Sequence, residues 1–199
     1  MKPLFKLLDQ DLAERIISEA KLVLAEVGMD IAVDETKQLL AEHGADVDGS
    51  DGRVRITDSM VEAALDSAPL SFSLYDVLGE ETHSFEGQRT HFTPGSAAIN
   101  ILDRNSGEIR PAVTADVVAL AKLVNGLPRY DAQSTALVSS DVPEAISDSY
   151  RLFLDLLYCE KPVVTGAFTI EGFEVIRDLL LAVRGSAEAL AEKPVAMLT

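Results

Sequence analysis

The residues best suited to chemistry lie directly after four apolar runs in the second half of the sequence. Small and hydroxyl side chains dominate these positions, which read TPGSA at 93–97, SSDVP at 139–143, GAFT at 166–169 and Thr199. Asp141 is the one carboxylate among them. If the apolar runs are parallel strands, these segments share the carboxyl edge of a sheet, where α/β proteins bind ligands. The pattern predicts a ligand site without a nucleophile–base pair, which argues against covalent hydrolase chemistry.

Several of these residues also have a purely structural interpretation. Ser140, Asp141 and Thr169 suit the N-caps of helices, and Gly95 suits a turn. His83 and His91 lie in a strand-rich region before the apolar runs. A metal site that uses both histidines is disfavoured, because neither a cysteine nor tight spacing supports it. We therefore predict no metal.

Other patterns exclude whole classes of function. The sequence contains no G-x-G-x-x-G, no P-loop and no H-E-x-x-H. A calcium loop starting at Asp46 fails because Asp51 stands where glycine is required and Thr57 where glutamate is required. The formal net charge of −16 repels phosphate backbones and anionic lipid, so neither nucleic acid nor a membrane surface is an expected partner.

The sequence composition indicates the cellular compartment of the protein. No apolar run reaches the ~18 residues of a membrane span, and the first residues become charged too early for a signal peptide. Cys159 is the single cysteine, which excludes an internal disulfide framework. We expect a cytoplasmic protein.

A repeated junction organises the second half of the chain. EKPV occurs at 160–163 and again at 192–195, and Pro128, Pro162 and Pro194 are 34 and 32 residues apart. Each proline follows a helical pattern and precedes an apolar run, because proline cannot continue a helix but can begin a strand. The lysine before it suits the negative end of a helix dipole. We therefore predict repeated βα units.

The predicted strands are parallel and adjacent in sequence order. They lie near 90–94, 131–138, 162–167 and 194–198, with helices between them. Residues 1–89 form a separate mixed α/β region in which Asp34 and Thr57 cap helices and two hairpins occur. An open doubly wound sheet and the first half of a (β/α)8 barrel both fit. The uncovered last strand predicts the front part of a longer protein, and its open edges predict a homo-oligomer.

Many short motifs in one order resemble the trimethylamine methyltransferase family. The resemblance starts with LAEVGMDIAVDETKQLLAEHGADVDGSDGRVRITDSMVEAALDSAP and continues through FSLYD, HFTPG, ILDRNSGEIRPAVTADVVALAKLVNGLPRYDA and KPVVTGAF. It implies an α/β fold: a (β/α)8 TIM-type barrel behind a small N-terminal region. Residues 1–89 would be the N-terminal cap and residues 90–199 the first four strands and three helices of the barrel.

The resemblance also implies an activity in methylamine and one-carbon metabolism, including methanogenesis. Family members move a methyl group from a tertiary or quaternary amine, such as glycine betaine, to the cobalt of a separate corrinoid protein. No cofactor would then be bound directly, and the corrinoid protein and the amine would be the partners. Some members carry pyrrolysine in the later part of the barrel, which has no counterpart in these 199 residues. The chain alone is therefore expected to be inactive.

A methylated ammonium cation needs aromatic faces and an acid. We expect Phe92, Phe168 and Asp141 to supply them, with Ser140 and Thr93 beside them, although core packing is the alternative for the two phenylalanines. No catalytic residue can be assigned from the resemblance. The alternative function is a non-catalytic ligand-binding or assembly module that keeps the fold.

Overall fold

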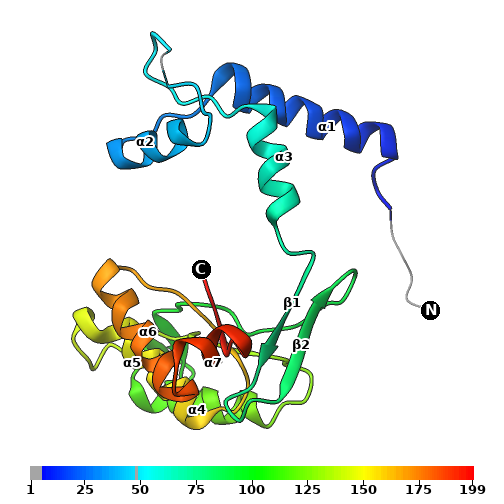
Figure 1. Ribbon diagram of the computed structural model, residues 1–199. Coiled ribbons are helices and arrows are strands. Elements are labelled where there is room, and N and C mark those ends of the chain that lie inside the picture. The colour runs from blue at the N-terminus through cyan, green and yellow to red at the C-terminus, as the bar shows by residue number, and fades with distance from the viewer. Residues whose placement is uncertain (1–5, 48) are drawn as a thin grey trace. The chain divides into compact units, whose positions relative to one another are not determined.

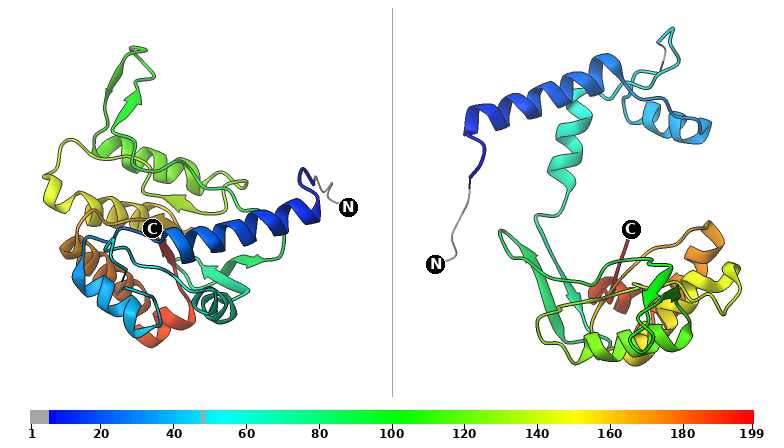
Figure 2. Two further views of the ribbon diagram at one scale, coloured as in Figure 1. Left: turned by 90° about the horizontal axis from the view of Figure 1, so that it is seen from above. Right: turned by 180° about the vertical axis from the view of Figure 1, so that it is seen from behind.

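The computed structural model describes residues 6–47 and 49–199, which fall into two compact units, 1–69 and 70–199 (Figures 1 and 2). The first unit is mainly helical, and the second contains the sheets. None of the helices in the described ranges has the length and apolar character needed to cross a membrane.

Local capping explains the helices of the first unit. Helix α1 (Gln10–Leu22) continues into a π-helical turn, η1 (Val23–Val27), and α2 (Asp34–Glu42) and α3 (Asp58–Ser67) follow. Thr57 caps α3 as predicted, because its side chain accepts the N–H of Met60. Asp34 is the first residue of α2 rather than its N-cap, which is Val33. There Asp34 still complements the helix dipole.

Short antiparallel bridges hold the rest of the first unit together. Met29 pairs with Val54, and Asp46 pairs with Arg55 across the predicted turn. Gly28 has φ +70°, and a Cβ there would lie 2.7 Å from the carbonyl oxygen of Val54. Only glycine satisfies both conditions, so this position fixes the approach of the two segments.

The second unit begins with the predicted hairpin of β1 (Ser71–Tyr75) and β2 (Glu81–Glu86). Phe72 and Phe85 are cross-strand partners whose ring centroids lie 4.6 Å apart. The backbone of Tyr75 donates to the carbonyl of Pro194 at 2.8 Å, and that of Val77 donates to Glu160 at 2.7 Å. These long-range bonds join the hairpin to the second unit, so the division falls at 69/70 rather than at the expected 89/90.

A second hairpin, which the sequence analysis did not predict as strands, consists of β3 (Asn100–Leu102) and β4 (Ile109–Pro111). It projects away from the rest of its unit (Figure 2). Asp103 organises its turn by accepting the N–H groups of Asn105 and Ser106. Arg110 then ties the hairpin to the first turn of α4 through Asp116, at 2.7 Å.

The central sheet is parallel and has the order β5–β6–β7. Its strands are β5 (Gln133–Ser134), β6 (Val163–Thr165) and β7 (Ala196–Leu198). The helices between and around them are α4 (Thr114–Asn125), the 3-10 turn η2 (Glu144–Ile146), α5 (Ser147–Tyr158), α6 (Ile170–Arg184) and α7 (Ala187–Glu192). The predicted strand at 162–167 lies between its sequence neighbours, so the expected order of these three strands is confirmed.

The predicted first strand at 90–94 is wrong. Residues 92–98 instead run beside β5 as an irregular extended segment, and Ala98 makes a parallel bridge to Leu137. Pro94 has no N–H to donate and Ala97 has φ +53°, so a regular ladder cannot form earlier. The amino end of this segment lies at Phe92, whose carbonyl accepts the N–H of Asp131 at 2.9 Å.

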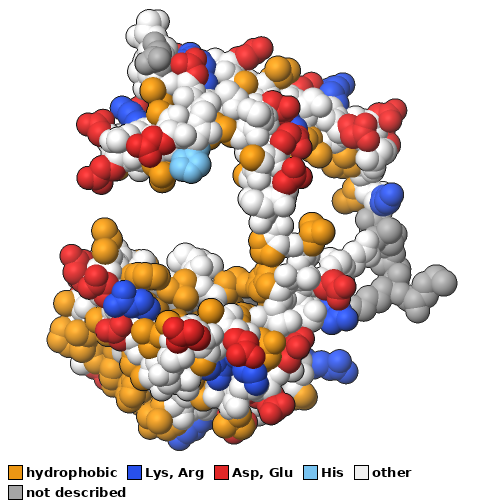
Figure 3. All heavy atoms as spheres, viewed as in Figure 1, with side chains coloured by type: hydrophobic (Ala, Val, Ile, Leu, Met, Phe, Trp, Pro, Cys, Tyr) orange, Lys and Arg blue, Asp and Glu red, His pale blue; other side chains and the backbone are white. Residues whose placement is uncertain are grey.

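Two apolar clusters form the core of the second unit. One lies between the sheet and helices α5 and α6 and consists of Leu152, Val163, Ile176, Leu180 and Val195. The other lies beside α4 and consists of Ala112, Val117, Leu137 and Leu154. Hydrophobic side chains also gather on the outside of this unit, over α5 and α6 (Figure 3).

The lysines in the two copies of the repeated junction bind different partners. The Lys161 ammonium donates to the carbonyls of Val124, Leu127 and Tyr130 at 2.6–2.7 Å, at and just beyond the end of α4. Lys193 instead donates to the carbonyl of Gly79 in the first hairpin, at 3.0 Å. Lys161 therefore binds at the negative end of a neighbouring helix rather than of the helix that precedes it.

Candidate functional site

Phe168 marks the carboxyl edge of the parallel sheet. It follows β6, and its side chain is 72% exposed. Its backbone N–H donates to the Asp148 carboxylate at 2.6 Å, which fixes the loop before α6. Thr169 then caps α6 by accepting the N–H of Gly172 at 2.9 Å. The loop is thus held on both sides of the exposed ring.

Three cavities include Phe168 in their lining, and two of them also contain acidic side chains. One, of about 600 Å³, lies between the first turns of α5 and α6, and Glu144, Asp148 and Glu171 contribute its carboxylates. The other, of about 390 Å³, includes Ser140 and again Glu144. No lysine, arginine or histidine is among the residues that line either cavity. An aromatic ring among acids is an arrangement suited to an organic cation.

Arg151 is a buried residue that contacts the groups at this carboxyl edge of the sheet. Its side chain is 2% exposed, and its guanidinium donates to the carbonyl of Thr135 at 3.0 Å and to Asp148 at 2.7 Å. It also lies 5.4 Å from the centroid of the Phe168 ring. Arg151 therefore balances the charge of Asp148 and covers one face of the Phe168 ring. Of the three carboxylates that line the larger cavity, Glu144 and Glu171 remain without a buried cationic partner.

The polar residues of α5 share one face of that helix. Asp148, Arg151 and Asp155 are spaced three and four residues apart, so all three point toward the sheet. Gln133 on β5 donates to Asp155 at 2.9 Å. Burial raises the pKa of Asp155 to about 7, although the bond from Gln133 and the charge of Arg151 oppose the rise. A buried polar row thus underlies the site.

The structure separates the residues predicted for the amine site. Phe168 and Ser140 line the cavities at the carboxyl edge. Asp141 is close in sequence, but its carboxylate accepts both the backbone N–H and the hydroxyl of Thr114 at 2.9 and 3.0 Å. Asp141 is therefore not an N-cap residue itself, because the N-cap of α4 is Val113, but its carboxylate binds the first residue of that helix from a later loop.

Phe92 and Thr93 lie at the other end of the extended segment. The backbone N–H of Phe92 donates to Asp131, just before β5, at 3.0 Å. That position is the amino edge of the sheet, so the structure does not bring Phe92 and Thr93 together with Phe168. The displacement follows from the later start of the strand pairing, at Ala98.

Sequence reasoning missed Glu144, Glu171, Asp148 and Arg151. The signal that could have found Asp148 and Arg151 is their spacing on an amphipathic helix, which places a charged pair on the side that faces the sheet. Glu144 and Glu171 lie in the first turns of η2 and α6, where acids also suit the helix dipole. For these two, only the tertiary arrangement shows a shared cavity.

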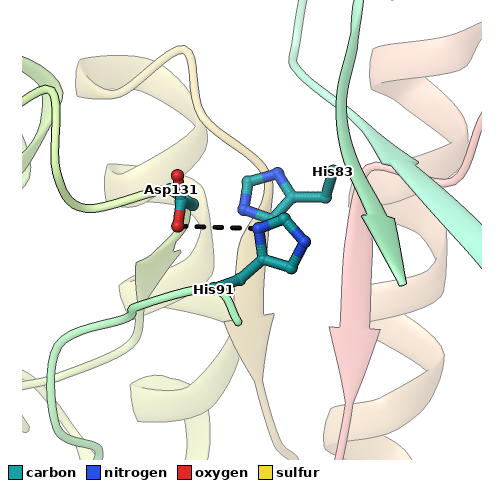
Figure 4. Close-up of side chains that lie close together, drawn as sticks. All are labelled: His83, His91 and Asp131. Atoms are coloured by element: carbon teal, nitrogen blue, oxygen red, sulfur yellow. Dashed lines mark ion pairs between the residues drawn. The ribbon is translucent and has the colours of Figure 1, made fainter. Parts of the chain in front are cut away.

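One group in the described part of the chain has the ligands for a metal ion. His83, His91 and Asp131 offer ligand atoms that all lie within 4.8 Å of one another (Figure 4). They come from β2, the segment after it and the second residue before β5. The group is at the amino edge of the sheet, on the opposite side from the cavities around Phe168. The structure thus brings together two histidines whose spacing in the sequence did not indicate a metal site.

Comparison with known proteins gives consistent results. The family model described as Trimethylamine methyltransferase (MTTB) matches residues 1–199. The chain is 24% identical over 194 residues to a glycine betaine methyltransferase of Desulfitobacterium hafniense (strain Y51), covering 97% of this chain and 40% of that protein. It is 24% identical over 172 residues to trimethylamine methyltransferase MttB of Desulfitobacterium hafniense (strain DSM 10664 / DCB-2), covering 86% of this chain and 35% of that protein. The chain therefore spans less than half the length of either relative.

Proposed function

Because the chain belongs to the trimethylamine methyltransferase family, we propose that the protein takes part in methyl transfer from a methylated amine. The substrate class is a tertiary or quaternary amine of the trimethylamine or glycine betaine kind, after the two relatives. We also propose that the parallel order β5–β6–β7, with helices between the strands, is the front part of a (β/α)8 barrel.

The observation that carries the proposal is the cavity beside Phe168. A methylated ammonium group is a cation with an apolar surface, so an aromatic face and nearby carboxylates bind it best. Phe168 supplies the face, and Glu144 and Glu171 supply negative charge without a basic neighbour in the lining. The cavity lies at the carboxyl edge of the sheet, which is the edge that barrel enzymes use.

The chemistry asked of these residues is positioning. A C–N bond breaks, the amine leaves with the electron pair, and the methyl group passes to a nucleophile held in line. The cavity lining contains no cysteine, lysine or histidine that could be that nucleophile. Cys159 is buried, and burial raises the pKa of its thiol. We propose that the acceptor is the cobalt of a corrinoid on a partner protein, which supplies the nucleophile when it docks.

Substitution of Phe168 tests the amine site. In the full-length protein, Phe168→Leu should weaken binding of tetramethylammonium or glycine betaine about 2- to 30-fold, because it removes the aromatic face but keeps an apolar side chain. Glu144→Gln should weaken the same cations and leave 3,3-dimethylbutanol, a neutral isostere, unaffected. Isothermal titration calorimetry measures both effects.

The matched control is Phe153→Leu, which changes an exposed phenylalanine on the outside of α5. Equal losses in Phe153→Leu and Phe168→Leu would reject the site. Methyl transfer to added corrinoid protein, followed by the visible absorbance of the corrinoid, separates the two functional classes. A protein that binds the amine at Phe168 but never methylates the corrinoid is the binding module, not the enzyme.

A further inference from the structure

We propose that His83, His91 and Asp131 bind a divalent transition-metal ion, with Zn²⁺ as the best match. The three residues bring two imidazole nitrogens and one carboxylate oxygen to one point (Figure 4). This site is separate from the amine cavity, because it lies at the opposite edge of the sheet. The proposal does not depend on the methyltransferase activity.

The hydrogen bonds of His91 determine which of its nitrogens is free. Nε2 lies 3.2 Å from the carbonyl oxygen of Ser84. A carbonyl can only accept, so Nε2 carries the proton. In the neutral ring, Nδ1 then has a lone pair, and it faces the Asp131 carboxylate at 3.5 Å. Two acceptors face each other there, which requires a cation or a proton between them.

His83 presents a second lone pair to the same point. Its Nδ1 lies 2.9 Å from the Thr82 hydroxyl, which itself donates to the carbonyl of Leu74 at 3.4 Å. The hydroxyl proton is used in that bond, so Nδ1 of His83 is the donor and Nε2 is unprotonated. The side chain is 1% exposed, and Nε2 has no hydrogen-bond partner. Burying an acceptor without a partner is costly unless something binds it.

The surroundings of His83 favour its neutral form. Burial lowers the pKa of His83, and the neighbouring His91 lowers it further. A neutral imidazole is the form that binds a metal. Each histidine also uses its other nitrogen in a hydrogen bond to oxygen, which is the outer-shell support that metal-bound histidines typically have.

The distances suit a small tetrahedral ion. With metal–ligand bonds of about 2.0–2.1 Å, two tetrahedral ligands lie roughly 3.4 Å apart. The His91–Asp131 pair is at 3.5 Å, and the remaining ligand atoms need only small side-chain rotations, since none lies beyond 4.8 Å. Two nitrogens and one oxygen suit zinc and leave one position for water.

The placement points to a stabilising ion. His83 belongs to the first hairpin, His91 follows it, and Asp131 precedes β5. An ion at this point would fasten the hairpin to the sheet. Catalytic sites lie at the carboxyl edge of a parallel barrel sheet, so a metal ion at the amino edge is expected to have a structural role.

Metal titration of the full chain, without an affinity tag, tests the proposal. Isothermal titration calorimetry of the metal-free protein with ZnCl₂ should show one tight site per chain. Co²⁺ should give the visible absorption of inner-sphere coordination. His83→Gln, His91→Gln and Asp131→Asn should each weaken zinc binding at least about tenfold. Zinc should also raise the melting temperature of the wild type but not of His91→Gln.

The sequence offers a matched control, because His43 is the remaining one of its three histidines and belongs to the other unit. His43→Gln should bind zinc as the wild type does. Asp131→Asn keeps an oxygen that can accept the Phe92 N–H, so it provides a folded variant if His83→Gln does not fold. Equal zinc affinity in wild type, His91→Gln and Asp131→Asn, or no Co²⁺ absorption in the wild type, would overturn the proposal.

Discussion

Asp155 is the most deeply buried carboxylate among the described residues. It is 1% exposed, one of its oxygens has no hydrogen-bond partner, and the Oε1 of its neighbour Gln133 has none either. A neutral carboxylic acid or an amide could satisfy both atoms, whereas a carboxylate cannot. The burial that raises the pKa of Asp155 to about 7 therefore makes the folded state hold a proton that the unfolded chain releases near 3.8.

This proton makes stability depend on pH. Between about pH 4 and pH 7 the folded state binds more protons than the unfolded state, so the free energy of unfolding falls as the pH rises. Asp155→Asn should remove that slope and raise the free energy of unfolding at pH 8 by roughly 2–4 kcal/mol. Urea unfolding at pH 5 and pH 8 measures it. Asp178→Asn, at an exposed position, should leave the slope in place, and an unchanged slope in Asp155→Asn would contradict the assignment.

At this same scale, residue type predicted only part of the site. Phe168 lies at the expected carboxyl edge because it follows a strand whose end the sequence could place, and its role in binding stays a prediction. Phe92 was assigned to the same edge because its strand was placed too early, and the true pairing begins at Ala98. Asp141 had both a capping and a ligand-site interpretation, and in the structure its carboxylate accepts the backbone N–H of Thr114. Side chains such as Glu144 and Glu171 meet only after folding, so no local pattern pairs them.

Among the elements, α4 depends on a residue outside itself. Lys161 donates to the carbonyl of Val124, in the last turn of α4, and to those of Leu127 and Tyr130 just beyond the helix, so one ammonium joins the helix end to the turn that follows it. Lys161→Met should therefore lower the free energy of unfolding by about 2–3 kcal/mol, since hydrogen bonds to charged groups are strong and three carbonyls lose a donor. Thermal and urea unfolding followed by circular dichroism check this.

Lys193→Met is the natural comparison, because the same junction sequence surrounds it. It loses one carbonyl contact, with Gly79, and should cost less than Lys161→Met. Equal losses would mean that the junction lysines act through general charge rather than through the carbonyls they bind.

The elements themselves were largely predictable. Thr57 and Thr169 cap helices where the sequence placed the caps, and the hairpin of residues 71–86 pairs across Gly79. These features depend on neighbours within a few residues. The first strand failed because Pro94 and the backbone of Ala97 interrupt a ladder whose partner lies about forty positions away. The contact between Lys161 and the end of α4 was not predicted either, because its two partners also lie far apart in the sequence.

At the scale of the whole molecule, the two units meet in sequence at an exposed leucine. Leu70 is 96% exposed and lies at the junction of the two units. Brief digestion of the full chain with chymotrypsin should therefore cut after Leu70 and leave a fragment that begins at Ser71. Mass spectrometry identifies the fragment, and Leu70→Gln should slow its appearance. A first cut near residues 87–90 would instead support the boundary expected from the sequence.

The first hairpin is fastened by residues synthesised long after it. The Arg184 guanidinium donates to the carbonyls of Tyr75, Asp76 and Val77, which lie 107 to 109 positions earlier in the chain. A ribosome adding about 5–20 residues per second needs roughly 5–20 s to cover that interval. During translation the nascent hairpin must wait that long for the guanidinium that binds its three carbonyls.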